Sequence, residues 1–202
     1  MKILITGTSS GVGAGLARLL MTGHDIISLN RSILDLSLID QVQQYDIPQI
    51  DMLINCAGVD IGGKIDFTNH QSTNVVEIMN TNLVSPMLLV QKALIKNNKC
   101  KIVNITSTNN KKYYANNLAY SLSKKALSLF GDMLRVDYPE LNYLEVQLGL
   151  TKTNFNINRY NNGKCLDRYI DIYSNPHLTI EQAATHIVSI LFDQTTFIEV
   201  SV

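Results

Sequence analysis

The chain of 202 residues is poor in cysteine, with only three, and has no tryptophan. Cys56, Cys100 and Cys165 are odd in number, widely separated and without a CxxC pair, so neither a disulfide framework nor a zinc site is expected. We expect buried thiols instead. The four histidines are equally scattered, and none stands at the spacing of metal ligands. The sequence therefore predicts no metal site.

Net charge is also absent, because Lys plus Arg and Asp plus Glu both number 17. Balanced charge gives no electrostatic reason to expect a nucleic-acid partner or a membrane surface. The longest apolar runs are of strand length, and the opening MKILITG leads straight into a glycine turn, which leaves no room for a signal peptide. We therefore expect a cytoplasmic protein that binds small molecules.

No linker rich in proline, glycine or serine divides the chain, and its hydrophobic content of 46% suffices for one well-buried core. We expect a single domain over residues 1–202. Apolar, β-rich runs alternate with amphipathic stretches, a pattern typical of an α/β protein with a parallel sheet and helices on both faces. The expected strands are Lys2–Thr6, Asp25–Leu29, Asp51–Cys56, Lys101–Thr106, Tyr143–Leu148 and Phe197–Val200. The expected helices are Val12–Met21, Leu38–Tyr45, Val75–Ile95, Leu118–Val136 and Ile180–Phe192.

A glycine-rich turn, TGTSSGVG at Thr6 to Gly13, follows the first strand and opens the first helix. Backbone N–H groups and the positive end of the helix dipole would face a ligand there, which suits a pyrophosphate. Gly7 permits a tight turn, Gly11 lets the backbone approach the phosphates, and Gly13 allows close packing of helix on strand. Taken alone, such a loop is also compatible with a plain strand-to-helix turn.

Tyr120 and Lys124 stand four residues apart in YSLSK, so they share one face of the expected helix. A nearby ammonium favours the phenolate, which makes Tyr120 a usable acid or base near neutral pH. Ser107 closes the run KIVNITS at the carboxyl edge of the sheet, and its hydroxyl could hydrogen-bond a carbonyl oxygen. Thr106 competes for that role. With nine tyrosines, one chance YxxxK is about as frequent as none, so the motif depends on its context.

The spacing TGxxxGxG, with NCAG at Asn55–Gly58, NITS at Asn104–Ser107 and the YxxxK, resembles the short-chain dehydrogenase/reductase family from Met1 to about Thr153. The resemblance implies a Rossmann-like, doubly wound parallel sheet. It implies a catalytic set in which Asn82 holds a water in a proton relay and Lys124 also binds the nicotinamide ribose. The four catalytic residues would be Asn82, Ser107, Tyr120 and Lys124. The thirteen residues from Ser107 to Tyr120 match the family, and Asn80 is the alternative to Asn82.

The resemblance also implies contacts with a nicotinamide cofactor along the whole carboxyl edge. The expected contacts are Gly7, Ser9, Ser10, Gly11, Val12, Gly13, Asn30, Arg31, Asp35, Leu36, Asn55, Ala57, Gly58, Tyr120, Lys124, Gly149, Thr151 and Thr153. Two residues depart from the family pattern: Cys56 replaces the second Asn of NNAG, and Leu148 replaces the Pro of PGxxxT. Asp35 resembles the family's residue near the adenine ring, and it could equally be a helix cap.

The end of the second strand indicates the choice of cofactor. An acidic residue there would accept the ribose 2′-hydroxyl, whereas this chain has Asn30 and Arg31. With no carboxylate to repel a 2′-phosphate and a guanidinium able to pair with it, NADP(H) is favoured, and NAD(H) is the alternative. An exposed Arg in a turn would explain the same residue.

The same stretch is unusually short, because only three residues separate Arg31 from Asp35 where the family has a helix and a third strand. A parallel crossover needs on the order of a dozen residues, so the third-strand unit is truncated. We therefore predict six strands, numbered along this chain, in the order 2-1-3-4-5-6. The second strand would then lie at the edge.

The segment Asn154–Leu178 takes the place of the family's substrate loop. Its Arg159, Tyr160, Lys164, Arg168, Tyr169 and Tyr173, with Lys111 and Lys112, hint at a phosphate or carboxylate on the substrate, although solvated surface charge is the alternative. The leading hypothesis is an NAD(P)(H)-dependent carbonyl reductase or alcohol dehydrogenase acting on a small molecule. A catalytically silent nucleotide-binding sensor or interaction module is the alternative. The resemblance further implies a homodimer or homotetramer.

Overall fold

A computed structural model describes residues 1–62, 66–110, 115–156, 174 and 176–201. Its six strands form one parallel sheet in the order β2-β1-β3-β4-β5-β6, so the predicted fold class and strand order are confirmed. The strands are β1 Lys2–Thr6, β2 Asp25–Leu29, β3 Met52–Asn55, β4 Lys101–Ser107, β5 Tyr143–Leu148 and β6 Phe197–Val200. In the described part of the chain no strand lies beyond β2.

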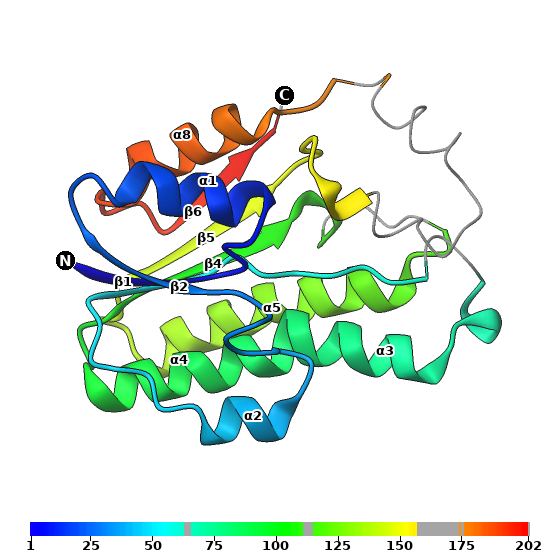
Figure 1. Cartoon of the computed structure of the whole chain (residues 1–202), viewed down its shortest axis with the longest axis horizontal. Helices are drawn as coiled ribbons and strands as arrows, with labels where there is room; N and C mark the ends of the chain where they lie inside the picture. Colours follow the sequence, from blue (N-terminus) through cyan, green and yellow to red (C-terminus); the bar gives the residue numbers. More distant parts are fainter. Residues whose placement is uncertain (63–65, 111–114, 157–173, 175, 202) are drawn as a thin grey trace.

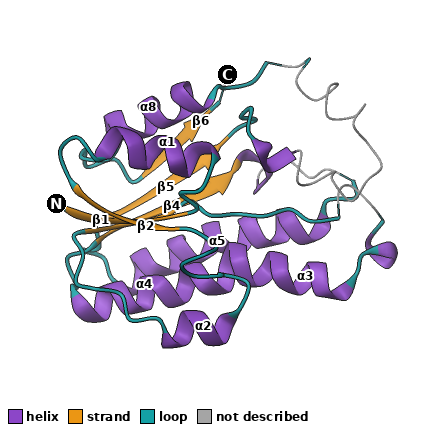
Figure 2. Ribbon diagram, in the orientation of Figure 1, coloured by secondary structure: helices purple, strands orange, loops and turns teal. Residues whose placement is uncertain are grey.

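Helices cover both faces of the sheet (Figures 1 and 2). On one face lie α1 (Gly11–Leu20) and α8 (Ile180–Ile190), packed against each other. On the other face lie α2 (Ile39–Gln44), α3 (Ser72–Met79), α4 (Ser85–Lys96) and α5 (Leu118–Asp137). The expected helix Val75–Ile95 is thus divided: a π-helical turn at Asn80–Val84 joins α3 to α4. Such turns are rare, and they occur most often at functional sites.

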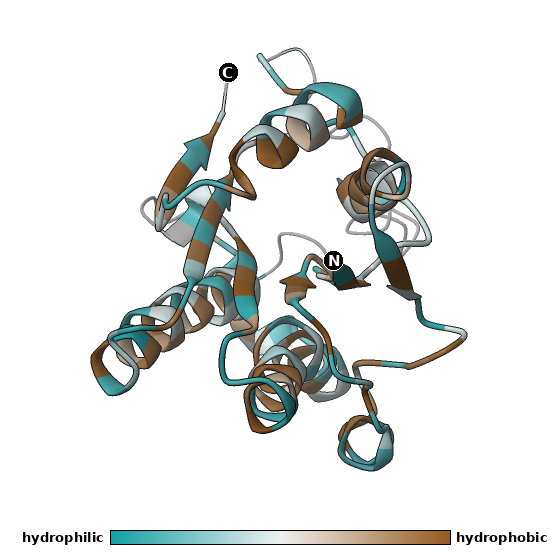
Figure 3. Ribbon diagram, turned by 90° about the vertical axis from the view of Figure 1, so that its left-hand side faces the viewer, coloured by the Kyte–Doolittle hydropathy of each residue, from teal (hydrophilic) through white to brown (hydrophobic). Residues whose placement is uncertain are grey.

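The interior strands β1, β3, β4 and β5 are buried on both faces, and their successive residues point to opposite sides of the sheet. In β1, Ile3 and Ile5 pack in the cluster beneath α1 and α8, whereas Leu4 packs in the cluster beneath α4. Hydrophobic bands therefore recur along the strands between the two helical layers (Figure 3). None of the helices in the described ranges is long and apolar enough to cross a membrane.

The short link after β2 is folded back by its own side chains. The amide oxygen of Asn30 accepts hydrogen bonds from the backbone N–H groups of Ser32 and Ile33, which closes a tight turn. Leu34 and Leu36 are then buried in the core. The link passes directly to α2, so β2 keeps one strand neighbour, as the spacing predicts.

Candidate functional site

A cavity of about 710 Å³ opens at the carboxyl ends of the central strands. Gly7, Cys56, Ser107 and Leu148, each at or just after the end of a strand, all line it. This is where ligands of open α/β sheets bind. Of the predicted site residues, all but two line the cavity: Gly7, Ser9, Ser10, Gly11, Val12, Gly13, Asn30, Arg31, Asp35, Leu36, Ala57, Gly58, Ser107, Tyr120, Lys124, Gly149, Thr151 and Thr153. Asn55 and Asn82 are buried behind its wall.

The glycine-rich loop needs glycine at defined positions. Gly7 and Gly11 have φ values of 76° and 60°, in the left-handed region that side chains disfavour. A Cβ on Gly7 would lie 2.8 Å from the Cα of Ala57, and one on Gly13 would clash with the carbonyl of Gly7. Ser10 precedes α1 without capping it through its side chain. The first N–H groups of α1 are therefore available to an anion in the cavity.

Tyr120 and Lys124 come from the first turns of α5, and both are buried against the cavity. The Lys124 Nζ donates a hydrogen bond to the carbonyl oxygen of Ile105 at 3.0 Å. Burial lowers the pKa of Lys124 to about 8, because a desolvated ammonium is less stable than one in water. The ring of Phe155 lies against Tyr120, with centroids 5.5 Å apart. The phenol of Tyr120 and the Lys124 amine, whose pKa is lowered, thus line the same cavity.

Cys56, the departure from the family pattern, lines the same cavity near Lys124. Its backbone N–H donates to the hydroxyl of Thr6 at 3.0 Å, which joins the ends of β1 and β3. Desolvation raises the pKa of the Cys56 thiol to about 12, so the thiol is neutral near pH 7. A neutral thiol cannot compensate the charge of the buried ammonium.

Asn82 and its competitor Asn80 have different partners. The Asn82 amide donates to the carbonyl of Val59 at 2.8 Å and to the hydroxyl of Ser123 at 3.0 Å, and it accepts from the N–H of Val59. It therefore ties the chain after β3 to α5 at Ser123, the residue directly before Lys124. The Asn80 amide donates instead to the carbonyl of Ser37, near α2. Only Asn82 reaches the region of Tyr120 and Lys124.

The hydroxyls of Ser107 and Thr106 also have different hydrogen-bond partners. The Thr106 hydroxyl donates to the Glu145 carboxylate at 2.8 Å, and Ser128 of α5 donates to the other oxygen of that carboxylate. The Ser107 hydroxyl accepts from the N–H of Asn109 at 3.2 Å at the cavity wall. Both residues line the cavity, but the Thr106 hydroxyl is engaged by Glu145, which favours Ser107 as the hydroxyl that meets a ligand.

Two carboxylates lie beside Arg31 at the far end of the cavity, so the sequence-based premise that none is present there is wrong. Arg31 Nη2 lies 2.9 Å from Glu77 Oε1, and Arg31 Nε lies 3.9 Å from Asp35 Oδ2. Asp35 also accepts hydrogen bonds from the N–H and the hydroxyl of Ser37. Partial burial acts to raise the pKa of Asp35, but the bonds from Ser37 and the charge of Arg31 lower it below its usual value.

The segment after β5 closes the other end. The Gly149 N–H donates to the carbonyl of Val200 at 2.8 Å, so the turn is anchored on β6 although Leu148 stands where the family has proline. The Thr151 hydroxyl donates to the Gly149 carbonyl, and the Thr153 hydroxyl accepts from the N–H of Phe155. This wall also includes the apolar Leu150 and Phe155.

Sequence reasoning missed several residues of the cavity wall, above all Glu77, Thr81, Val59, Asp60 and Phe155. Val59 and Asp60 directly follow NCAG, and Thr81 directly precedes Asn82, so their places beside these motifs could have indicated them. Glu77 belongs to no motif, and packing brings it to the site. Lys111, Lys112, Arg159, Tyr160, Lys164, Cys165, Arg168, Tyr169 and Tyr173 lie outside the described residues. Within the described ranges, no three His, Cys, Asp or Glu residues gather as a metal site would require.

Comparisons with known proteins point to one family. A family model of short-chain dehydrogenases matches residues 36–163. The ketoacyl reductase HetN of Nostoc sp. is 30% identical over 164 residues, which is 66% of this chain and 56% of that protein. Dehydrogenase/reductase SDR family member 7B of Xenopus tropicalis is 35% identical over 115 residues, 54% of this chain and 37% of that protein. The chain thus spans from about a third to just over half of these relatives.

Solved structures show the same fold. A serine dehydrogenase complexed with NADP⁺ aligns with a TM-score of 0.85 at 20% identity, over 100% of this chain and 95% of that one. A small-chain dehydrogenase in complex with NADPH aligns with a TM-score of 0.83 at 21% identity, over 99% and 96%. A 4-hydroxyisoleucine dehydrogenase complexed with NADH gives 0.79 at 22% identity, over 98% and 96%.

Proposed function

Because the chain belongs to the short-chain dehydrogenase family, we propose that it is an NAD(P)(H)-dependent carbonyl reductase or alcohol dehydrogenase that acts on a small substrate. The observation that carries the proposal is the cavity itself. The glycine loop lines one side of it, and Ser107, Tyr120 and Lys124 line the other. A nucleotide site and an acid/base site are thus parts of one enclosed space.

The residues present fit a dinucleotide. The uncapped start of α1 suits a pyrophosphate, because it offers backbone N–H groups, and the left-handed turns at Gly7 and Gly11 place no Cβ in the way. Asp35 and Leu36 would border the adenosine half, and Gly149 to Thr153 the nicotinamide half. When bound, the nicotinamide supplies or accepts the hydride.

Tyr120 would give a proton to the carbonyl oxygen in reduction and take it back in alcohol oxidation. The Lys124 ammonium would stabilise the phenolate, and with a pKa of about 8 it is charged over most of the neutral range. The Ser107 hydroxyl would orient the carbonyl oxygen. Asn82 would hold α5 against the chain after β3, because its amide is bonded to both Val59 and Ser123.

The cofactor preference follows from Arg31, whose guanidinium is suited to a 2′-phosphate. We propose that NADP(H) is favoured and that NAD(H) also binds, because Glu77 and Asp35 bring negative charge to the same end. The substrate end combines the apolar Val59, Leu150 and Phe155 with the hydroxyl of Ser107. This lining suits a small, largely uncharged carbonyl or alcohol.

Fluorescence titration with NADPH and NADH, followed by turnover of a panel of small ketones, tests the proposal. We expect saturable binding of both nucleotides and NADPH oxidation that depends on an added ketone. Absence of nucleotide binding would contradict the proposal at its base. Tight binding without turnover on any carbonyl or alcohol would favour the alternative, a catalytically silent nucleotide sensor.

We also propose a homo-oligomer that pairs through α5 and α4. Exposed apolar side chains recur at steps of three, four or seven residues along α5 and form a stripe: Leu118, Leu122, Leu129, Met133 and Val136. Each is more than half exposed, and Met87 and Ile95 of α4 add to this outer face of the helical layer. Exposed apolar residues gathered on one helix face are typical of an interface, and a two-fold axis would let a second copy bury the same stripe.

Replacing Leu122 and Leu129 together by Glu should convert the oligomer into a monomer, because paired copies would bring like charges into an apolar interface. Sedimentation velocity measures the mass. The matched control is Met21→Glu, which places the same charge on an exposed apolar position beside α1, on the opposite face. A monomeric wild type, or an unchanged mass in the double variant, would rule out pairing through this stripe.

A further inference from the structure

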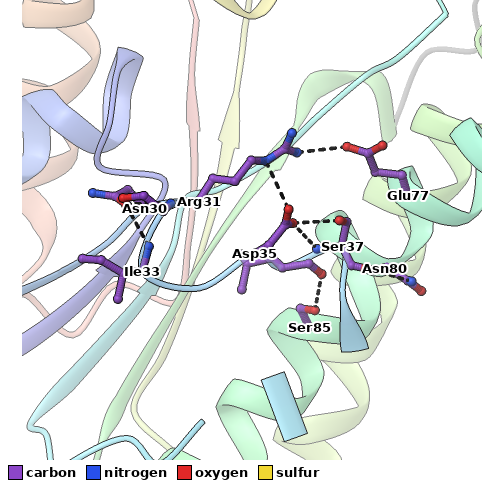
Figure 4. A network of polar contacts seen from close by, with 10 residues as sticks. Asn30, Arg31, Ile33, Asp35, Ser37, Glu77, Asn80 and Ser85 are labelled. Atoms are coloured by element: carbon purple, nitrogen blue, oxygen red, sulfur yellow. Dashed lines mark hydrogen bonds and ion pairs between the residues drawn. The ribbon is translucent and has the colours of Figure 1, made fainter. Parts of the chain in front are cut away.

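Arg31, which lines the cavity, forms an ion pair with Glu77, a residue far away in the sequence. It follows β2, whereas Glu77 lies in α3, 46 residues later, and the two side chains meet at 2.9 Å (Figure 4). Asp35 approaches the same guanidinium at 3.9 Å. All three residues line the cavity at its adenosine end. Among the described residues at this end of the cavity, Arg31 is the one cation, and two carboxylates share it.

The surrounding bonds keep Glu77 opposite Arg31. One helical turn beyond Glu77, the Asn80 amide donates to the carbonyl of Ser37, and the Ser85 hydroxyl donates to the carbonyl of Leu36 (Figure 4). These bonds fasten the link after β2 to α3 and α4. Oδ1 of Asp35 is occupied by Ser37. Glu77 is therefore the closer partner of Arg31, and Asp35 shares its carboxylate with Ser37.

The charges at this end decide between the two cofactors. Arg31 contributes one positive charge and Glu77 and Asp35 contribute two negative ones, so the group is negative as a whole. A 2′-phosphate would have to take Arg31 from Glu77 and lie near both carboxylates. A 2′-hydroxyl carries no charge and meets neither cost. The Arg31 side chain is 60% exposed, so its ion pair is weak and can be broken.

Resting on the proposed nicotinamide cofactor, we propose that Glu77 is a specificity-determining residue that restrains the preference for NADP(H) by competing with the 2′-phosphate for Arg31. Glu77 touches no reacting atom in this account. It acts through Arg31, so its effect falls on the ratio of the two affinities and leaves the chemical step unchanged.

Glu77→Gln should tighten NADPH binding by about fivefold, the upper range of an exposed ion pair, and change NADH binding by less than about twofold. Fluorescence titration gives both dissociation constants. The matched control is Glu181→Gln, which breaks the surface pair Arg18–Glu181 of 3.0 Å, outside the cavity. It should leave both dissociation constants unchanged. In an Arg31→Leu background, Glu77→Gln should change the ratio by less than about twofold, because no guanidinium is left for Glu77 to hold.

Three other outcomes would refute the role of Glu77, its action through Arg31, or the proposed function. If the wild type binds both nucleotides but Glu77→Gln leaves the ratio within twofold, or weakens both equally, Glu77 does not set specificity. A gain for NADPH that persists without Arg31 would show direct repulsion of the phosphate and overturn the competition for Arg31. If neither the wild type nor Glu181→Gln binds either nucleotide, the proposed function itself fails, and the role of Glu77 fails with it.

Discussion

Tyr120→Phe should lower the turnover number of carbonyl reduction by about a thousandfold, while NADPH binds within about twofold of the wild-type affinity. The substitution removes one hydroxyl and keeps the ring, so the packing of residue 120 against Phe155 is retained. Phenylalanine has no hydroxyl to give a proton to the carbonyl oxygen, although it fills the same space. The loss would therefore fall on the chemical step and leave binding intact.

Stopped-flow or steady-state oxidation of NADPH with a ketone measures the rate, and titration measures binding. The matched control is Tyr138→Phe, the same change at the carboxyl end of the same helix, where the side chain is exposed. It should leave both quantities unchanged. Wild-type turnover in Tyr120→Phe would remove Tyr120 from the proton transfer, whatever nucleotide is bound.

Gly13→Ala should destabilise the protein by about 2 to 3 kcal/mol and weaken nucleotide binding more than tenfold. A Cβ at this position would clash with the carbonyl of Gly7 and approach that of Thr6 to 3.2 Å, and both are backbone atoms that cannot rotate away. Alanine is the better helix former, so propensity alone would stabilise α1 by about 1 kcal/mol. The expected loss of stability is therefore steric, and it would displace the turn that faces the phosphates.

Urea unfolding, with the same slope assumed for both proteins, measures the stability difference. Gly23→Ala is the matched control, since a Cβ there would meet nothing within 4 Å and Gly23 lies in the turn after α1. It should be neutral for both stability and binding. Equal unfolding midpoints for Gly13→Ala and the wild type would show that the loop can shift to admit a side chain.

The strands were the most predictable part of the molecule. The ranges of β1, β2, β5 and β6 agree residue for residue with the apolar runs, because each run is rich in β-branched and apolar residues and is bounded by turn residues. The strand order followed from a length argument, since three residues cannot build a crossover. The single-domain organisation and the cytoplasmic location stay predictions.

The partners of the site residues could not be predicted in the same way. Glu77 lies on the same side of the cavity as Arg31 only because α3 packs beside the folded link, and no local pattern encodes that packing. The Thr106 hydroxyl bonds Glu145, which also bonds Ser128, and these two residues come from other elements. The choice of Ser107 as the hydroxyl that meets a ligand depends on these contacts. The π-helical turn around Asn82 is equally hidden, because its apolar spacing reads as continuous helix.

The position of β2 explains how so short a chain keeps a complete cavity. An outermost strand contributes a single row of backbone hydrogen bonds, so omitting a unit beyond it opens no seam between the strands that remain. The cavity, in contrast, is built over the joints between β1, β3, β4 and β5. The middle of the sheet therefore holds the cavity together, and the short link after β2 can shape the end where Arg31 lies without disturbing it.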